Sequence, residues 1–148
     1  MYKIIKTEDG SETIYSEQYD ESMHSIHGAY DEALQKHIAS SGILTLKGDE
    51  INILDIGFGI GYNSLAAIYE LQKINSDAAL CIYGLEKDRS FSNIFDELHF
   101  GDGRAEVFSK IQRAFNAGAY KDDKINIKIF FDDARSSIQK IDNNSIDI

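Results

Sequence analysis

The feature that most constrains this chain is a short apolar run, residues 51–56, that breaks at once into glycines at alternate positions, Gly57, Gly59 and Gly61. From about Asn63 the apolar residues follow helical spacing. A buried strand, a glycine turn and an amphipathic helix form the first βα unit of a nucleotide-binding α/β sheet. The glycines allow a sharp turn off the strand, a close approach of backbone to a ligand, and close packing of helix on strand.

The spacing of the glycines separates two kinds of cofactor. The dinucleotide fingerprint is G-x-G-x-x-G, but here the third glycine comes one residue early and Tyr62 stands where that fingerprint has glycine. This disfavours a nicotinamide-dependent reductase. With Asp55 two residues before the first glycine, the pattern D-x-G-x-G-x-G resembles motif I of class I S-adenosylmethionine-dependent methyltransferases. In that family the acid lies near the methionine end of the cofactor and the glycine loop passes under it. The alternative is a tight βα turn without a ligand.

A second acid follows the next predicted strand, Ala79 to Leu85, which ends in Glu86. Ligands of α/β sheets lie beyond the carboxyl ends of the strands. A carboxylate there can accept hydrogen bonds from both ribose hydroxyls. We therefore expect Glu86 to bind the ribose; the alternative is an exposed acid before a charged turn.

The third predicted strand, Ile125 to Phe131, is followed by Asp132, Asp133 and Ala134. A carboxylate and a backbone N–H at this strand end can read the adenine edge. Asp133 can equally be the N-cap of a helix from Ala134 to Ile141. The two roles use different atoms, so both can hold.

The remaining chain completes a coarse plan. Residues 2–6 and 11–15 are β-prone and flank the turn Asp9-Gly10, which predicts a hairpin. A helix is expected from Ala29 to Ser40, and Gly42 is expected to end it. We expect an irregular helical region from Ser90 to Tyr120 whose phenylalanines pack in the core.

Residues 145–148 are expected to begin a fourth strand. The predicted fold is thus an incomplete Rossmann-like α/β sheet that ends in this strand, with residues 1–45 as an N-terminal extension and 46–148 as the cofactor-binding half of a truncated domain. The incomplete sheet would expose the edge of the strand at 51–56, which predicts self-association.

The composition further limits the class of protein. The chain has 148 residues, 43% of them hydrophobic, and a net charge of −10, which argues against a broad nucleic-acid face on these residues. The single cysteine, Cys81, lies in an apolar run and is expected to be buried and structural. The absence of a secretory signal at the start of the chain favours a cytoplasmic protein.

The N-terminal stretch narrows the family. Asp9-Gly10-Ser11 with Thr13, then His24-Ser25 with Gly28-Ala29, precede the segment Gly57 to Asn63, which reads Gly-Phe-Gly-Ile-Gly-Tyr-Asn. These elements, in this order, resemble the methyltransferase domain of the tRNA 5-methylaminomethyl-2-thiouridine biosynthesis proteins (MnmC) and their stand-alone relatives. The resemblance covers most of residues 8–63.

The resemblance implies transfer of a methyl group from S-adenosylmethionine to the aminomethyl nitrogen of the wobble uridine of tRNA. Together with the acids at the strand ends, it predicts a cofactor site of the following residues: His24, Ser25, Asp55, Gly57, Phe58, Gly59, Gly61, Asn63, Glu86, Asp132, Asp133 and Ala134. In the family the acid that holds the amine follows the fourth strand, so the catalytic residue is expected beyond Ile148.

Other readings stay open. The acceptor can be a small molecule, which the acidic charge would suit, or the chain can be a non-catalytic binding module that keeps the cofactor half of the fold. His24 and His27, without further histidines or cysteines nearby, make a poor metal site, and no metal is expected. They are read instead as closing the cofactor pocket or as packing residues.

Overall fold

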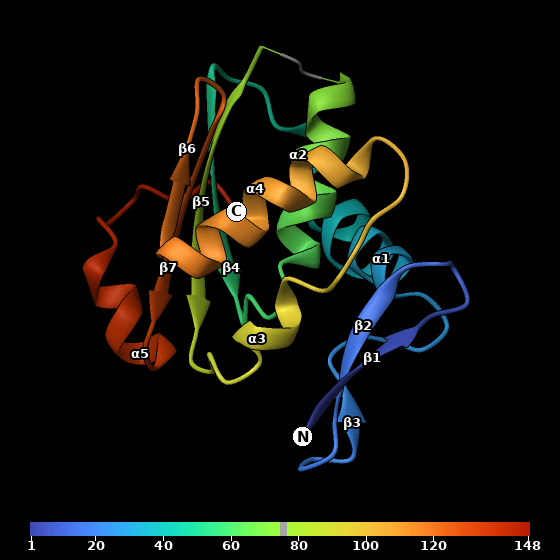
Figure 1. The fold of residues 1–148 in the computed structure, drawn as a ribbon. Coiled ribbons are helices and arrows are strands. Elements are labelled where there is room, and N and C mark those ends of the chain that lie inside the picture. The colour runs from blue at the N-terminus through green and yellow to red at the C-terminus, as the bar shows by residue number, and fades with distance from the viewer. Residues whose placement is uncertain (75–76) are drawn as a thin grey trace.

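The computed structural model describes residues 1–74 and 77–148. At its centre lies a four-stranded sheet of order β4-β5-β7-β6 (Figure 1). Its strands are β4 (Glu50–Ile56), β5 (Ala79–Glu86), β7 (Ile125–Phe131) and β6 (Ala119–Lys121). The first three are parallel and β6 pairs antiparallel with β7. The predicted α/β class and the three predicted parallel strands are confirmed.

One face of this sheet is apolar along every parallel strand. Ile53 pairs with Ile82, and Ile82 with Ile127, so buried β-branched side chains line up across the sheet. Such side chains pack well on a pleated surface. This face forms the floor of the hydrophobic core.

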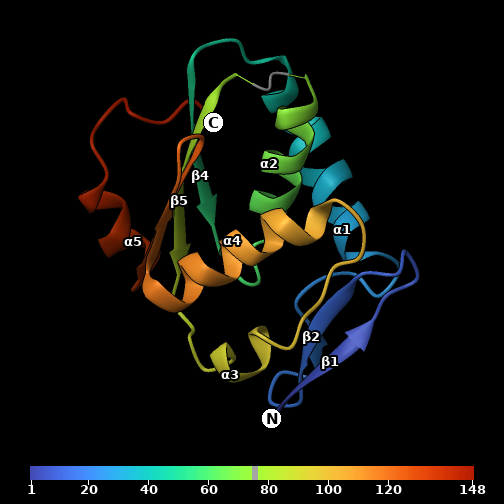
Figure 2. The ribbon, with the colours of Figure 1, turned by 45° about the horizontal axis from the view of Figure 1, so that its top comes forward.

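Two long helices cover that face, α2 (Tyr62–Ile74) and α4 (Arg104–Ala117). Figure 2 shows them on the same side of the sheet, with α5 (Ala134–Ser137) on the other side. The core contains Phe91, Phe95, Phe108 and Phe115 of the region before and within α4, as predicted, while Phe100 is partly buried. The Phe95 and Phe115 rings lie edge to face, 4.6 Å apart. Short elements complete the plan: α3 (Ser92–Phe95) and the 3-10 helices η2 (Ile43–Thr45) and η3 (Ile138–Lys140).

The prediction of helical structure as far as Tyr120 is wrong at its end. Gly118, with φ +83°, ends α4, and Tyr120 lies in β6. Pairing with β7 decides this, because the short segment gains backbone hydrogen bonds at the sheet edge that its own sequence does not announce. The helix predicted to run to Ile141 is shorter, since Ile141 is already extended.

The expected helix at 29–40 is present but irregular. It begins as α1 (Ala29–Glu32) and continues as a π-helix, η1 (Ala33–Ala39). Gly42, with φ +82°, follows its end as predicted. The residues Asn75-Ser76-Asp77 predict the end of the helix that follows the glycine loop, and the first two of them lie outside the described residues.

The N-terminal sheet holds β1 (Tyr2–Lys6), β2 (Glu12–Ser16) and the short β3 (Glu21–Ser22). The predicted hairpin is confirmed, with Gly10 at φ +84° in its turn. Ile14 of this sheet is fully buried in the same hydrophobic cluster as the central strands. The division at residue 45 into an extension and a cofactor-binding half stays a prediction.

The hairpin turn also caps the first helix. The side-chain oxygens of Thr7, Asp9 and Ser11 accept hydrogen bonds from three consecutive backbone N–H groups at the start of α1, those of Ala29, Tyr30 and Asp31. A helix leaves its first N–H groups without partners inside the helix. Residues far away in sequence therefore supply this cap, because the α1 N-cap itself makes no side-chain hydrogen bond.

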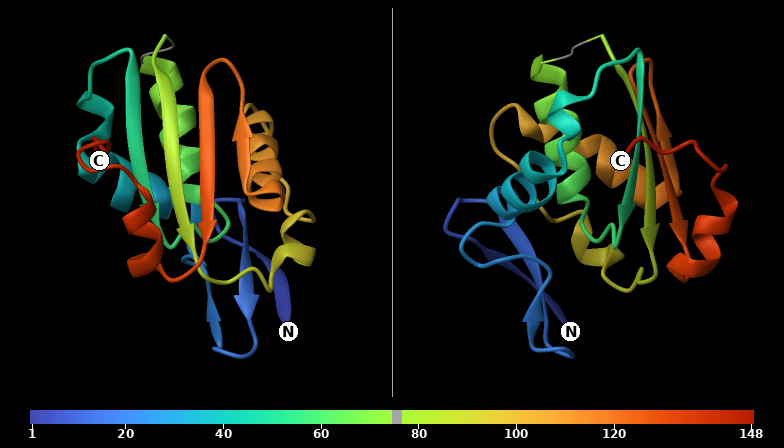
Figure 3. Two further views of the ribbon diagram at one scale, coloured as in Figure 1. Left: turned by 90° about the vertical axis from the view of Figure 1, so that its left-hand side faces the viewer. Right: turned by 180° about the vertical axis from the view of Figure 1, so that it is seen from behind.

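The last residues lie beside β4, on the side away from β5 (Figure 3). Ile148 N–H donates to the Asn52 carbonyl at 3.3 Å, and Leu54 N–H donates to the Ile148 carbonyl at 2.8 Å. These two bonds flank Ile53 in the parallel pattern. The segment is not a regular strand, but it pairs where a fourth strand was expected.

This pairing has two consequences for the sheet. Part of the β4 edge that was expected to be exposed is occupied by Asp147 and Ile148, while self-association through this edge stays a prediction. The order of neighbours also reverses at β4, since β5 follows on one side and the 145–148 segment on the other. Such a reversal is a topological switch point, where open α/β sheets bind ligands.

Candidate functional site

The glycine loop follows β4 at this switch point. Gly57, Gly59 and Gly61 all have positive φ, at +75°, +54° and +76°. A side chain on Gly57 would meet nothing within 4 Å, and one on Gly59 would meet only a carbonyl oxygen at 3.8 Å. These two positions are glycine because of backbone conformation, and they leave the backbone open to a ligand.

Gly61 is glycine for a different reason. A Cβ there would lie 2.6 Å from Ile111 and 3.0 Å from the Phe58 ring. The third glycine therefore makes room for Ile111 of α4 and for the Phe58 ring, whereas the sequence suggested close packing of a helix on a strand.

The Phe58 side chain lies in the core and is 2% exposed. It packs over Gly84 of β5, where a Cβ would lie 2.5 Å from the ring. Only the Phe58 backbone is thus available to a ligand. Sequence reasoning missed Gly84, although a glycine inside an apolar strand is a signal of close approach.

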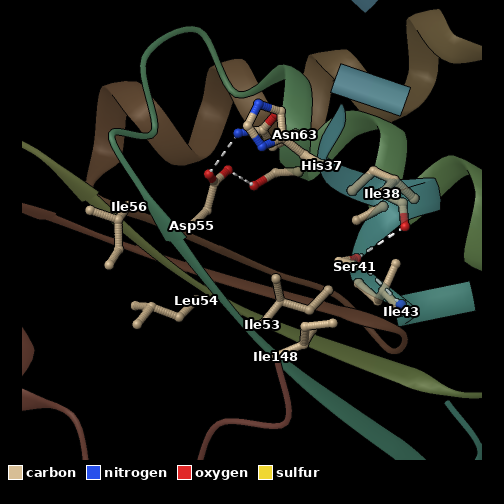
Figure 4. A pocket seen from close by; sticks show the side chains of 12 residues that line it. His37, Ile38, Ser41, Ile43, Ile53, Leu54, Asp55, Ile56, Asn63 and Ile148 are labelled. Atoms are coloured by element: carbon tan, nitrogen blue, oxygen red, sulfur yellow. Dashed lines mark hydrogen bonds between the residues drawn. The ribbon is translucent and has the colours of Figure 1, made fainter. Parts of the chain in front are cut away.

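Asp55 is 6% exposed at the carboxyl end of β4. Its carboxylate accepts hydrogen bonds from Ser64 Oγ at 2.7 Å and from Asn63 Nδ2 at 3.2 Å (Figure 4). Burial raises the pKa of Asp55, and the two donors oppose that rise. Two predicted site residues, Asp55 and Asn63, are thus in contact, and Ser64 is a partner that sequence reasoning missed.

Glu86 joins the second strand end to the loop. One carboxylate oxygen accepts from Gly59 N–H at 2.7 Å and the other from Asp88 N–H at 2.7 Å. The carboxylate is therefore held in one orientation. An ionised carboxylate has about four lone-pair sites, so about two remain for further donors.

The third strand end carries Asp132, Asp133 and Ala134. Asp133 is the N-cap of α5, accepting from Arg135 N–H at 3.0 Å. Its side chain also pairs with the Arg135 guanidinium, which lowers the pKa of Asp133. The capping role predicted from sequence is confirmed, and contact with adenine stays a prediction. Asp132 accepts from Asp133 N–H at 2.8 Å.

His24 lies beside the start of α2. Its ring centroid is 4.8 Å from that of Tyr62, and its Nδ1 is 3.2 Å from Thr13 Oγ1. Burial lowers the pKa of His24 to about 4, so the imidazole is neutral at pH 7. Ser25 N–H donates to the Glu32 carboxylate at 2.7 Å, which fixes the backbone next to this ring.

Tyr62 connects the N-terminal sheet to the loop. It is fully buried, and its hydroxyl donates to the Glu12 carbonyl. Its ring also packs edge to face on Phe100, 5.1 Å away. The residue that replaces the third glycine of the dinucleotide fingerprint is therefore a packing residue that fixes the hairpin against α2.

The described residues 1–74 and 77–148 carry neither a metal-binding cluster nor a membrane-spanning helix. They contain no cluster of three or more His, Cys, Asp or Glu side chains placed to hold a metal ion. None of their helices combines the length and apolar character needed to cross a membrane. Cys81 is buried, as predicted.

The fold has a solved counterpart. Over 99% of its length the chain is similar to the crystal structure of MnmC2 from Aquifex aeolicus, with a TM-score of 0.85 and 29% sequence identity. The chain has the fold of an MnmC-type methyltransferase domain. The resemblance seen in the glycine loop and the N-terminal motifs is thereby confirmed.

The chain also has a sequence relative, and both matched proteins are longer than the chain. The chain is 31% identical over 142 residues to an uncharacterized protein of Methanocaldococcus jannaschii. It spans 47% of the Aquifex chain and 38% of the Methanocaldococcus protein, less than half of each. No protein-family model matches the chain.

Proposed function

We propose that this MnmC-type domain binds S-adenosylmethionine and serves a methyltransferase whose acceptor is the aminomethyl nitrogen of the wobble uridine in tRNA. The observation that carries the proposal is the contact between Glu86 and the Gly59 N–H at 2.7 Å. Glu86, the candidate for ribose binding at the end of β5, therefore contacts the open glycine loop that follows the neighbouring strand β4, at the switch point of the sheet.

The proposed site runs along three strand ends. Asp55 lies by the methionine end, with Gly57 and Gly59 beneath the cofactor. Glu86 uses its free lone pairs for the ribose hydroxyls, since its bonds to backbone leave about two of them open. Asp132, Asp133 and the Ala134 N–H face adenine, while His24 and Ser25 close the pocket from the N-terminal side.

The chemistry needs little from the protein beyond placement. The amine lone pair forms the new N–C bond while the S–C bond of the cofactor breaks. The electron pair of the broken bond stays on sulfur, and the cofactor leaves as S-adenosylhomocysteine. The methylated ammonium then releases one proton to a base or to water. Because the sulfonium is already activated, correct alignment of the amine supplies much of the acceleration.

A small-molecule acceptor is the second candidate. The net charge of −10 favours it, because phosphate binding depends on clustered basic residues. For the tRNA reading, the basic contacts must come from outside these residues. Methylation assays of the full-length protein with tRNA and with free amines would separate the two candidates, since only one class of acceptor should be methylated.

The cofactor proposal is tested by calorimetric titration with S-adenosylhomocysteine, with NADH as the comparison ligand and circular dichroism as the control for folding. We expect binding of the first and none of the second. Folded protein that binds neither, or that prefers NADH, contradicts the proposal.

A pair of variants locates the site. Gly59→Val adds a branched side chain at φ +54° in the open loop, whereas Gly10→Val adds the same side chain at φ +84° in the turn of the N-terminal hairpin, where an added Cβ meets nothing within 4 Å. Both carry a backbone strain of about 1–2 kcal/mol. Only Gly59→Val should abolish binding of S-adenosylhomocysteine; equal loss in both variants would argue against the assigned loop.

A further inference from the structure

The turn that follows Glu86 is bonded to the N-terminal sheet. Asp88 N–H donates to one oxygen of the Glu86 carboxylate at 2.7 Å, so the place of Asp88 helps to fix the orientation of that carboxylate. The Asp88 side chain accepts a hydrogen bond from the Tyr2 hydroxyl at 2.8 Å, across 86 residues of sequence. Two consecutive hydrogen bonds therefore link β1 to the acid proposed to bind the ribose.

The Tyr2 ring is itself held in place. It meets the buried Phe91 ring edge to face, with the two centroids 6.0 Å apart. The Tyr2 backbone pairs with Ser16 in the N-terminal sheet. Figure 2 shows β1 close to α3, beyond the carboxyl ends of the central strands. Because a tyrosine side chain has only two χ angles, a ring packed in this way presents its hydroxyl in a defined direction.

The acceptor of this bond is charged. Burial opposes ionisation of Asp88, but hydrogen bonds from Ser90 and Tyr2 outweigh it and lower the pKa of Asp88. A hydrogen bond to an ionised acceptor is about twice as strong as one between neutral groups. The bonds from Ser90 only close a local turn. Among the described residues, Tyr2 is thus the partner that joins the Asp88 side chain to a distant element.

Packing does not replace this bond. An open hollow of about 380 Å³ adjoins it, with Tyr2 and Asp88 among the residues that line the hollow. Hydrogen bonds, rather than surrounding atoms, therefore determine where the Asp88 side chain points. The next residue, Arg89, is bonded elsewhere: its guanidinium donates to the Asn116 carbonyl at 3.2 Å and lies 4.0 Å from the centre of the Phe131 ring. Two distant elements thus hold the turn, one through Tyr2 and one through Arg89.

We propose that Tyr2 is a positioning residue for the cofactor, which holds Asp88 so that the Glu86 carboxylate is aligned with the ribose hydroxyls. This inference rests on the proposed function. Tyr2 acts only through Asp88 and Glu86. The N-terminal sheet is then a working part of the cofactor site, in addition to its role in packing.

The test compares Tyr2→Phe with Tyr15→Phe in the full-length protein. Each variant removes one hydroxyl that donates to an aspartate, and the Tyr15 hydroxyl donates to Asp20 within the N-terminal region. Calorimetric titration gives the Kd of each protein for S-adenosylhomocysteine and for its 2′,3′-dideoxy analogue, which lacks both ribose hydroxyls. Circular dichroism checks that each variant is folded.

The ratio of the two Kd values isolates the ribose contact. In the wild-type protein the analogue should bind about tenfold more weakly or worse, because it cannot donate to a carboxylate. Tyr2→Phe should weaken binding of S-adenosylhomocysteine about threefold or more and leave binding of the analogue within about twofold, so the ratio falls. Tyr15→Phe should keep the wild-type ratio. A role in folding alone would weaken both ligands equally and leave the ratio unchanged.

A double variant tests the route through Asp88. Asp88→Ala should lower the ratio as Tyr2→Phe does, and the combined variant should match Asp88→Ala alone, because residues that act through one contact are not additive. An unchanged ratio in Tyr2→Phe, or effects of the two substitutions that multiply, would overturn the inference. A wild-type protein that does not bind S-adenosylhomocysteine, or binds both ligands equally, would instead contradict the proposed function on which the inference rests.

Discussion

The Glu86 carboxylate accepts a hydrogen bond from the Gly59 N–H at 2.7 Å, so the end of β5 holds the loop that follows β4. Its other oxygen accepts from Asp88 N–H. The contact gives this acid two tasks, to order the glycine loop and to present the remaining lone pairs to a ligand. A substitution at Glu86 should therefore affect both.

Glu86→Gln replaces one acceptor oxygen by an NH₂ group, which cannot accept the bond from a backbone N–H. A hydrogen bond to a charged group contributes about 1.5–3 kcal/mol, so affinity for S-adenosylhomocysteine should fall about tenfold or more. Calorimetric titration measures this. Glu50→Gln, the same change on an exposed acid at the opposite end of β4, is the control; equal affinity in the two variants would count against the site.

Gly28→Ala should destabilise the fold. A Cβ at Gly28 would lie 3.0 Å from the Asp9 carboxylate and 3.2 Å from Asp31 Cβ, and Asp9 cannot retreat without giving up its hydrogen bonds. Overpacking of this kind costs about 1–3 kcal/mol. Urea denaturation gives the free energy of unfolding. Gly101→Ala, where the new methyl meets nothing within 4 Å, should be nearly neutral.

Gly84→Ala tests the support of the glycine loop. The added methyl would lie 2.5 Å from the buried Phe58 ring, which must move. We expect a loss of about 1–3 kcal/mol in stability from overpacking, together with weaker binding of S-adenosylhomocysteine because Phe58 lies within the loop. A variant with unchanged stability and affinity would show that the ring can be accommodated elsewhere.

Asp9 should make stability depend on pH in the acid range. Burial opposes ionisation, but hydrogen bonds from Ser11 and Thr7 outweigh it and lower the pKa of Asp9 from 3.8 to about 2. The unfolded chain therefore binds the proton first. The contribution of Asp9 is complete above its ordinary pKa and is lost as the pH falls through about 4 to 2. Asp9→Asn should flatten the pH dependence of unfolding in this window; an unchanged slope would contradict the assignment.

His24 should act at higher pH. Burial lowers the pKa of His24 from 6.5 to about 4, so the unfolded chain takes up this proton first and stability falls as the pH drops from about 6.5 to 4. Above 6.5 the contribution is complete. His24→Phe, which keeps a ring beside Tyr62 and cannot be protonated, should remove this slope. Unfolding curves between pH 7 and 4 measure it, and an identical slope in the variant would argue that another group titrates.

Much of the site could be read from the sequence. The strand at 51–56, the alternate glycines, and acids directly after the next two strands all follow from local patterns, and parallel strands bring their carboxyl ends to one edge. The bond between Asp55 and Asn63 could not be read, since it depends on the exact direction in which α2 leaves the loop.

By itself, the sequence determined the class of fold, the three parallel strands, the hairpin and the positions of the candidate acids. These depend on periodicity and turn chemistry, which are local. The tertiary structure alone decided that Tyr120 lies in a strand, that Asp9 and Ser11 cap a helix about twenty residues further along the chain, and that the helix predicted from Ala29 continues as a π-helix from Ala33 to Ala39. Each of these depends on contacts between segments distant in the chain, where packing and backbone pairing override local preference.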